Sequence, residues 1–122
     1  MKSLKDDSNA NLLFFKKEVE KFVNERNWTK YHTPKNLIQA LGIEVSELSE
    51  IFLFKDLDIQ MINENRSIFE NISDEIADIF IYLISLVNRL DINLTDAFTR
   101  KMMKNRIKYP IEEFNNGDYY KK

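Results

Sequence analysis

Two pairs of carboxylates, each spaced three residues apart, lie in apolar stretches of the sequence. The pairs are Glu44 with Glu47, and Glu75 with Asp78. Residues i and i+3 project from one face of a helix, so two facing helices would bring four carboxylates into one small volume. Hard oxygen ligands suit Mg²⁺ or Mn²⁺, and the chain has no Cys and one His to offer zinc. The spacing is therefore that of a divalent-metal site.

Acidic pairs with this spacing also arise without function. The chain has 20 Asp and Glu among its 122 residues, and this composition yields about three such pairs by chance. Position is more informative than spacing, because Glu44 lies beside an apolar stripe and Glu75, Asp78 and Tyr82 share a face next to another. From the spacing alone, surface salt bridges are the default interpretation and a metal site is the alternative.

Length and composition predict one domain over residues 1–122, with a core from about 11 to 110 and polar termini at 1–10 and 111–122. Only two Gly and two Pro interrupt the chain, and strand-type alternation is not sustained, so the fold class predicted is all-α. A net charge of −2 and a pI near 5.5 argue against a nucleic-acid partner.

No membrane partner is expected either. The longest apolar run, Ile79 to Val87, is too short to cross a bilayer, and Met1 to Ala10 is polar and lacks a signal-peptide core. A cytoplasmic location is the expectation. The same apolar run has almost no polar side, which in a chain of this size predicts cover by further copies, as a homodimer or homotetramer.

Helical periodicity and capping residues predict four helices. They extend from about Asn11 to Arg26, from the N-cap Thr33 to about Lys55, from just after Ser67 to about Leu90, and from the N-cap Asn93 to just before Tyr109. The second and third carry the acidic pairs and should be antiparallel. Residues 56–67 are predicted as a loop or short helix and residues 112–122 as a frayed tail. Gly42 lies inside the second helix, where we expect a close approach by another backbone or a ligand.

Six short motifs occur in one order that resembles the MazG-like all-α nucleoside triphosphate pyrophosphohydrolases, and most closely their short dCTP pyrophosphatase type. The resemblance covers residues 15–110. The motifs are Trp28, His32-Thr33-Pro34-Lys35-Asn36-Leu37, Glu44-Val45-Ser46-Glu47-Leu48-Ser49-Glu50, Asp74-Glu75-Ile76-Ala77-Asp78-Ile79, Lys101-Met102 and Asn105-Arg106-Ile107-Lys108-Tyr109-Pro110.

The resemblance implies Mg²⁺-dependent cleavage of a nucleoside triphosphate between its α and β phosphates, which gives the monophosphate and pyrophosphate. Such an activity suits nucleotide-pool clean-up. The implied metal ligands are Glu44, Glu47, Glu75 and Asp78, with Mn²⁺ as a substitute ion. A carboxylate that is not fully engaged as a ligand can deprotonate water, and Glu47 is our prediction for that catalytic role.

Phosphate groups also need cationic and polar partners. The family pattern indicates Lys101, Asn105, Arg106 and Tyr109, at the end of the fourth predicted helix. The alternative is that these cations complement the dipole of the helix C-terminus and that Tyr109 packs where the helix stops.

Aromatic residues are the candidates for binding the nucleobase, because a base stacks on a ring. They are Trp28, His32, Phe54 and Tyr82, and the family pattern adds Asn36. For each ring the structural alternative is packing in the core or at a helix end. Several positions depart from the dCTP type, which has Trp at the position of Phe54, Arg at that of Lys35, and Gly near the positions of Ile43 and Ser46.

Because of these departures, the sequence predicts the class of reaction more firmly than the nucleobase of the substrate. dCTP and its modified forms are the leading candidates for the substrate. The alternatives are another diphosphate-containing substrate on the same fold, or a non-catalytic helical interaction module whose acidic pairs are solvated. Added Mg²⁺ should stabilise an enzyme of this kind and leave an interaction module unchanged.

Overall fold

The computed structural model describes residues 5–119, and within them every regular element is a helix. The prediction of an all-α fold is confirmed. The elements are α1 (Leu12–Glu25), the 3₁₀ helix η1 (Thr29–Tyr31), α2 (Pro34–Ile51), α3 (Ile59–Glu64), α4 (Arg66–Leu90), α5 (Leu94–Lys108) and α6 (Ile111–Phe114). The chain forms two compact units, one ending at Asp91 and one beginning at Ile92. Each unit is described by itself.

Side-chain caps set the starts of the long helices. The Thr33 hydroxyl accepts from the backbone N–H of Asn36 (3.2 Å), and Pro34 occupies the first helical position, where its missing N–H breaks no hydrogen bond. Asn93 caps α5 by accepting from the N–H of Asp96 (3.0 Å). Both predicted caps are confirmed.

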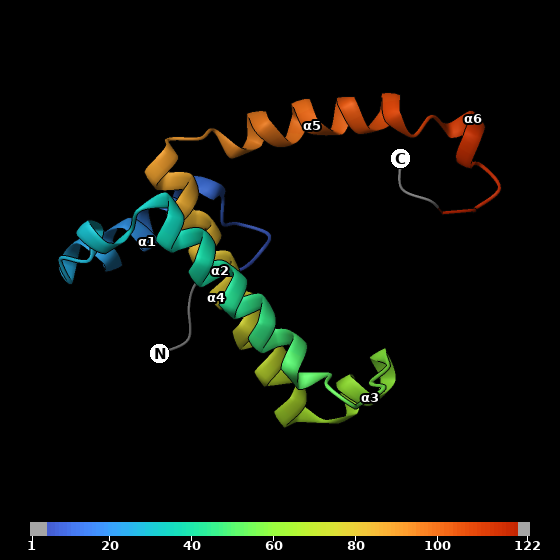
Figure 1. The fold of residues 1–122 in the computed structure, drawn as a ribbon, viewed down its shortest axis with the longest axis horizontal. Coiled ribbons are helices and arrows are strands. Elements are labelled where there is room, and N and C mark those ends of the chain that lie inside the picture. The colour runs from blue at the N-terminus through green and yellow to red at the C-terminus, as the bar shows by residue number, and fades with distance from the viewer. Residues whose placement is uncertain (1–4, 120–122) are drawn as a thin grey trace. The chain divides into compact units, whose positions relative to one another are not determined.

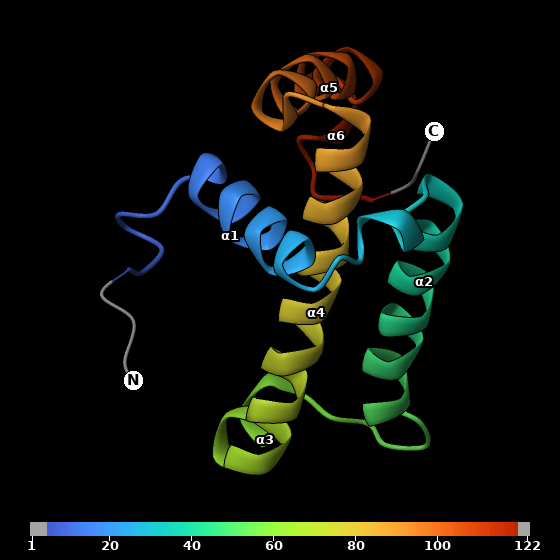
Figure 2. The same cartoon turned by 90° about the vertical axis from the view of Figure 1, so that its left-hand side faces the viewer.

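The first unit is built on the antiparallel pair α2 and α4, which lie side by side over most of their length (Figures 1 and 2). Leu37 of α2 and Ile84 of α4 are its two fully buried large side chains. Helix α1 packs across α4 (Figure 2), where the rings of Phe15 and Phe80 meet edge to face with centroids 5.1 Å apart. The pair holds the two predicted acidic motifs at fixed positions on facing helices.

One local prediction about the second helix is wrong, and another is tested only in part. It ends at Ile51 and not near Lys55, because Phe52 closes its last turn and Phe54 takes a positive φ of 57°, which reverses the chain. A side chain at Gly42 would meet no atom within 4 Å, so no described backbone approaches this exposed helical residue closely. Close approach by a ligand stays a prediction.

The stretch predicted as a loop or short helix contains α3, which confirms the second possibility. In the second unit, α5 ends at Lys108 as predicted. The tail predicted as frayed contains the short helix α6, and the Tyr109 ring packs edge to face on Phe114 at 5.5 Å. Residues 120–122 of that tail and residues 1–4 lie outside the described part.

None of the described helices combines the length and the apolar character needed to cross a membrane.

Candidate active site

Three of the four predicted metal ligands converge between α2 and α4. Glu44 of α2 and Glu75 and Asp78 of α4 each place one carboxylate oxygen within 4.8 Å of the other two. Glu75 and Asp78 meet because they are three residues apart on one helical face, and Glu44 reaches them across the antiparallel pair. Glu44 and Glu75 are half-buried, while Asp78 is exposed. We refer to these three residues as the acidic cluster.

Two oxygens of the acidic cluster are buried without a partner. The Oε2 atoms of Glu44 and Glu75 accept no hydrogen bond from any described residue. Burial raises the pKa of Glu44 from 4.5 to about 7, and the nearby carboxylates of Glu75, Glu47 and Asp78 act in the same direction. Contacts between carboxylates become hydrogen bonds only when one of them carries a proton. In the absence of a cation, a proton on one of these carboxylates therefore relieves the repulsion between them.

Glu47 lies at the margin of this arrangement. It is exposed and is not one of the three residues whose oxygens meet within 4.8 Å, yet its carboxylate is near enough to raise the pKa of Glu44. A carboxylate at the edge of a cation site can still contact a water molecule there. Its roles as ligand and as base stay predictions.

The acidic cluster fits a hard divalent cation. Its donors are all carboxylate oxygens, the ligand type that Mg²⁺ and Mn²⁺ prefer. Its two unpartnered oxygens are buried acceptors that lack a donor, a situation that native proteins rarely leave without an ion or ordered water. Glu44, Glu75 and Asp78 are thus the residues able to hold such an ion.

A separate cavity of about 420 Å³ opens between α1 and the C-terminal part of α4. This α1–α4 cavity has the size of small-molecule sites. Its walls combine apolar side chains with polar and charged ones. The residues are Leu13, Lys16, Lys17, Val19, Glu20, Val23, Asn24, Thr29, His32, Ser85, Asn88, Arg89 and Asp91. None belongs to the acidic cluster, so the two features are neighbours along α4 and not one pocket.

One face of α4 connects them. Asp78, Tyr82, Ser85 and Arg89 follow one another at i, i+4, i+7 and i+11, a single stripe of the helix. Asp78 belongs to the acidic cluster, and Ser85 and Arg89 line the α1–α4 cavity. The seven residues from Asp78 to Ser85 correspond to about 10 Å along the helix axis. This distance is comparable to the length of a nucleotide from its phosphates to its base.

His32 is the predicted base-binding residue that the structure places in the cavity wall. Arg89 Nε donates to the backbone carbonyl of His32 (3.0 Å). Burial, assisted by the Arg89 charge, lowers the pKa of His32 and favours the neutral ring. Tyr82 is half-buried on the face that joins the acidic cluster to the cavity.

The remaining predicted residues of the first unit do not line the cavity. Asn36 donates its side-chain N–H to the carbonyl of Tyr31 (3.0 Å), so it ties η1 to α2. Trp28 is partly exposed and packs edge to face on Phe22 at 5.8 Å. Phe54 is 99% exposed. Stacking of a base on Trp28 or Phe54 stays a prediction.

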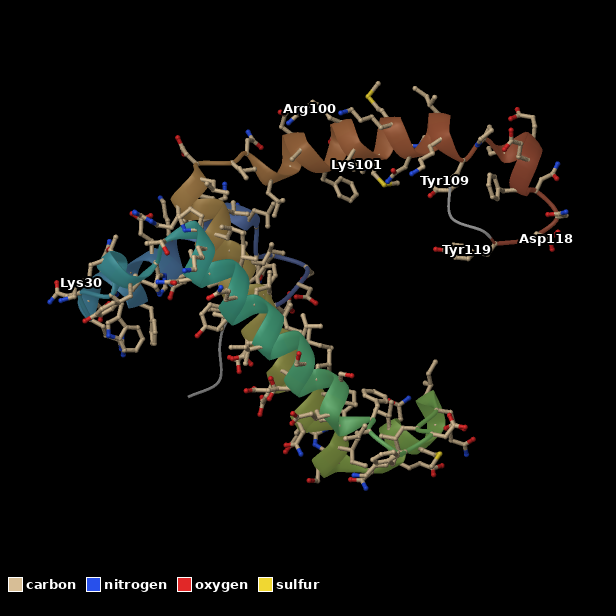
Figure 3. All side chains as sticks on the ribbon, in the orientation of Figure 1. Lys30, Arg100, Lys101, Tyr109, Asp118 and Tyr119 are labelled. Atoms are coloured by element: carbon tan, nitrogen blue, oxygen red, sulfur yellow. The ribbon has the colours of Figure 1, made fainter. Side chains whose placement is uncertain are left out.

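The predicted phosphate-binding residues all belong to the second unit. Lys101 lies on α5 and Tyr109 at its C-terminal end (Figure 3). Arg106 lies in the last turn of the same helix, and Asn105, directly before it, is half-buried. Their part in binding phosphate stays a prediction.

Sequence reasoning missed several cavity residues, among them Lys16, Asn24, Asn88 and Arg89. A signal was present for two of them, because Asn88 and Arg89 are the first polar residues after the apolar run of α4, and Arg89 also extends the stripe from Asp78. The sequence carries no signal for Lys16 and Asn24, because their place in the cavity wall depends on how α1 crosses α4.

The chain is thus an all-α protein with an antiparallel helical pair whose facing carboxylates are able to hold a divalent cation. The MazG-like family model matches residues 40–122, more than half of the chain. A pyrophosphatase from Archaeoglobus fulgidus has a similar structure, with a TM-score of 0.69 and 40% identity over 77% of this chain and 87% of that one. The chain belongs to the MazG-like family.

Curated relatives with the name dCTP pyrophosphatase 1 also match. The Bos taurus protein is 39% identical over 92 residues, which cover 74% of this chain and 54% of that protein. The Homo sapiens protein is 38% identical over 91 residues, which cover 73% and 53%. The chain thus spans about half the length of the curated relatives it matches.

Proposed function

We propose that this chain is a nucleoside triphosphate pyrophosphohydrolase that depends on a divalent cation and cleaves between the α and β phosphates. The observation that carries the proposal is the convergence of Glu44, Glu75 and Asp78 within 4.8 Å, with two buried oxygens unpartnered. Membership of the MazG-like family and the relatives' names support it. The products are a nucleoside monophosphate and pyrophosphate.

In this proposal the acidic cluster holds Mg²⁺, with Mn²⁺ as a substitute. Such an ion, when bound, neutralises charge on phosphate oxygens and makes a coordinated water more acidic. Glu47, exposed at the edge of the acidic cluster, orients the attacking water and removes its proton. Lys101, Asn105, Arg106 and Tyr109 are proposed to bind phosphate, on the strength of the family pattern.

The nucleoside lies along α4, with its sugar and base toward the α1–α4 cavity. The stripe from Asp78 through Tyr82 to Arg89 supports this direction, because it joins the acidic cluster to the cavity over a nucleotide's length. The neutral His32 ring and the apolar side chains of the cavity wall suit an uncharged base. We propose dCTP or a modified dCTP as the leading substrate, in agreement with the name of the curated relatives.

We also propose that the chain acts as a homodimer or homotetramer. Phe69, Ile76 and Leu83 of α4 recur every seven residues and remain 41%, 53% and 36% exposed. Ile38 and Val45 of α2 repeat the same spacing and are 56% and 49% exposed. Apolar stripes with a seven-residue period are typical of helices that pack on other helices, and a second copy offers identical stripes.

A substrate panel tests the activity. Canonical and modified deoxynucleoside and ribonucleoside triphosphates are incubated with the full chain, in Mg²⁺ and in EDTA, and the products are identified by chromatography. We expect monophosphate and pyrophosphate in Mg²⁺ alone, with dCTP or a modified form turned over fastest. If no triphosphate is hydrolysed by folded protein, the proposal fails, and other diphosphate-containing substrates become the next candidates.

A further inference from the structure

The α1–α4 cavity contains a carboxamide whose orientation is set by the fold. Asn88 Nδ2 donates to the backbone carbonyl oxygen of Lys16 on α1 at 3.0 Å. A carbonyl oxygen only accepts, so the amide cannot be turned around without placing two oxygens face to face. The bond joins residues 72 positions apart and fixes this side chain between the two helices that form the cavity.

This orientation leaves an acceptor for a ligand. Asn88 is half-buried and lines the cavity, and among the described residues no donor reaches its Oδ1 atom. Nor is Oδ1 one of the fully buried side-chain oxygens without a partner. A molecule in the cavity thus meets a carbonyl-type acceptor held in place by α1.

The second amide of the cavity differs in this respect. Asn24 Oδ1 accepts from the hydroxyl of Thr29 at 2.9 Å. A hydroxyl both donates and accepts, so the opposite orientation of Asn24 would also be satisfied. Of the two amides that line the cavity, only Asn88 therefore has an orientation fixed by its hydrogen bond.

We infer that Asn88 is a specificity-determining residue, whose Oδ1 accepts a hydrogen bond from the 4-amino group of a cytosine base. The inference rests on the proposed function and its leading substrate. On the base-pairing edge of cytosine, the 4-amino group is the only donor, since N3 and O2 are acceptors. Uracil and thymine carry a carbonyl oxygen in that position, which would face the Asn88 oxygen and leave both acceptors unsatisfied.

The inference predicts a preference between two substrates that differ at this edge. Relative kcat/KM is measured for dCTP and dUTP with the full chain in Mg²⁺. We expect the wild-type chain to favour dCTP by about 10- to 100-fold, the usual effect of one buried hydrogen bond made or left unmade. Asn88→Leu replaces the amide by an apolar side chain of similar size, which removes both the acceptor and the bond to the Lys16 carbonyl, and Asn88→Ala removes the whole amide.

In both variants we expect the ratio of dCTP to dUTP to fall to within about threefold of unity, mainly through loss of dCTP turnover. If the role of Asn88 were purely structural, its loss would lower kcat/KM equally for both substrates and leave their ratio unchanged. Asn63→Leu replaces an exposed Asn of α3 and serves as the matched control, with the wild-type ratio expected.

Two results overturn the inference. One is a wild-type chain that hydrolyses dCTP and dUTP equally or prefers dUTP. The other is an Asn88→Leu variant that keeps the wild-type ratio. Absence of turnover of every triphosphate would instead overturn the proposed function itself, so the two failures are distinguishable.

Discussion

Glu44 on α2 and Glu75 on α4 face each other across the antiparallel pair, and each holds a buried Oε2 atom that no described residue satisfies. Two carboxylates in such a position repel each other unless a proton or a cation lies between them. The effect is seen at Glu44. Burial raises the pKa of this residue to about 7. Repulsion within the acidic cluster thus destabilises the folded chain when no cation is bound. A cation bound by the same carboxylates would remove this repulsion.

Stability of the metal-free chain should fall as the pH rises. The pKa of Glu44 is 4.5 ordinarily and about 7 in the folded chain. Between these values the folded state holds a proton that the unfolded state has lost, so the free energy of unfolding decreases from about pH 4.5 to about pH 7 and is not regained above it. Thermal melts in EDTA across this range test it. In Glu44→Gln the stability should depend less on pH over this range. An unchanged slope would show that another group is responsible.

Added Mg²⁺ should stabilise the folded chain at pH 7.5. An ion that binds only the folded state contributes about 2.7 kcal/mol at a concentration 100 times its Kd. We expect the melting temperature to rise with Mg²⁺ concentration in the wild-type chain and to change little in Asp78→Ala. Asp74→Asn alters an exposed acid one residue before Glu75 and should respond like the wild type. Equal responses of Asp78→Ala and the wild type would remove Asp78 from the site.

Glu47→Gln separates catalysis from cation binding. If Glu47 takes the proton of the attacking water, its amide should lower kcat by about 10²- to 10⁴-fold. The rise in melting temperature with Mg²⁺ should remain, because Glu47 lies outside the three converging residues. Loss of the Mg²⁺ response together with kcat would make Glu47 a ligand, and wild-type turnover would exclude it from the mechanism.

The hydrophobic core of the first unit depends on α4. Ile84 is 0% exposed, and Ile84→Ala should lower the free energy of unfolding by about 2 to 5 kcal/mol, because the deleted atoms leave a cavity. Ile81→Ala, at a position 42% exposed on the same helix, should have a much smaller effect. Denaturant unfolding measures both. Similar values for the two variants would contradict the assignment of the core.

The exposed apolar stripes give a test of self-association. Ile38 of α2 is 56% exposed, and Ile38→Glu should weaken the oligomer at least about tenfold by placing a charge in the proposed interface. Ile59→Glu is the matched control, since Ile59 of α3 is 79% exposed and belongs to neither stripe. Sedimentation analysis measures the association. A wild-type chain that is monomeric at micromolar concentration would contradict the proposal.

Features that depend on a few neighbouring residues were predicted well from the sequence. The caps Thr33 and Asn93 are confirmed because a cap is made within three residues of the chain. Glu44, Glu75 and Asp78 were predicted to converge because helical periodicity places them beside apolar stripes that have to face each other.

Features that depend on distant segments were not predicted. The end of α2 was placed too late because the positive φ of Phe54 has no signal in its residue type. The orientation of Asn88 depends on the backbone of Lys16, which lies 72 residues earlier in the chain. The α1–α4 cavity exists only through the crossing of α1 over α4, and so most of its walls had no counterpart in the sequence pattern.

In the proposed function, the acidic cluster supports cleavage of a triphosphate between its α and β phosphates. The most direct measurement is the product distribution from dCTP in Mg²⁺, with wild-type chain and Asp78→Ala side by side. We predict dCMP and pyrophosphate from the wild type, no turnover in EDTA, and at least about a hundredfold loss in Asp78→Ala. Formation of dCDP and phosphate, or equal turnover with and without Mg²⁺, would contradict the account.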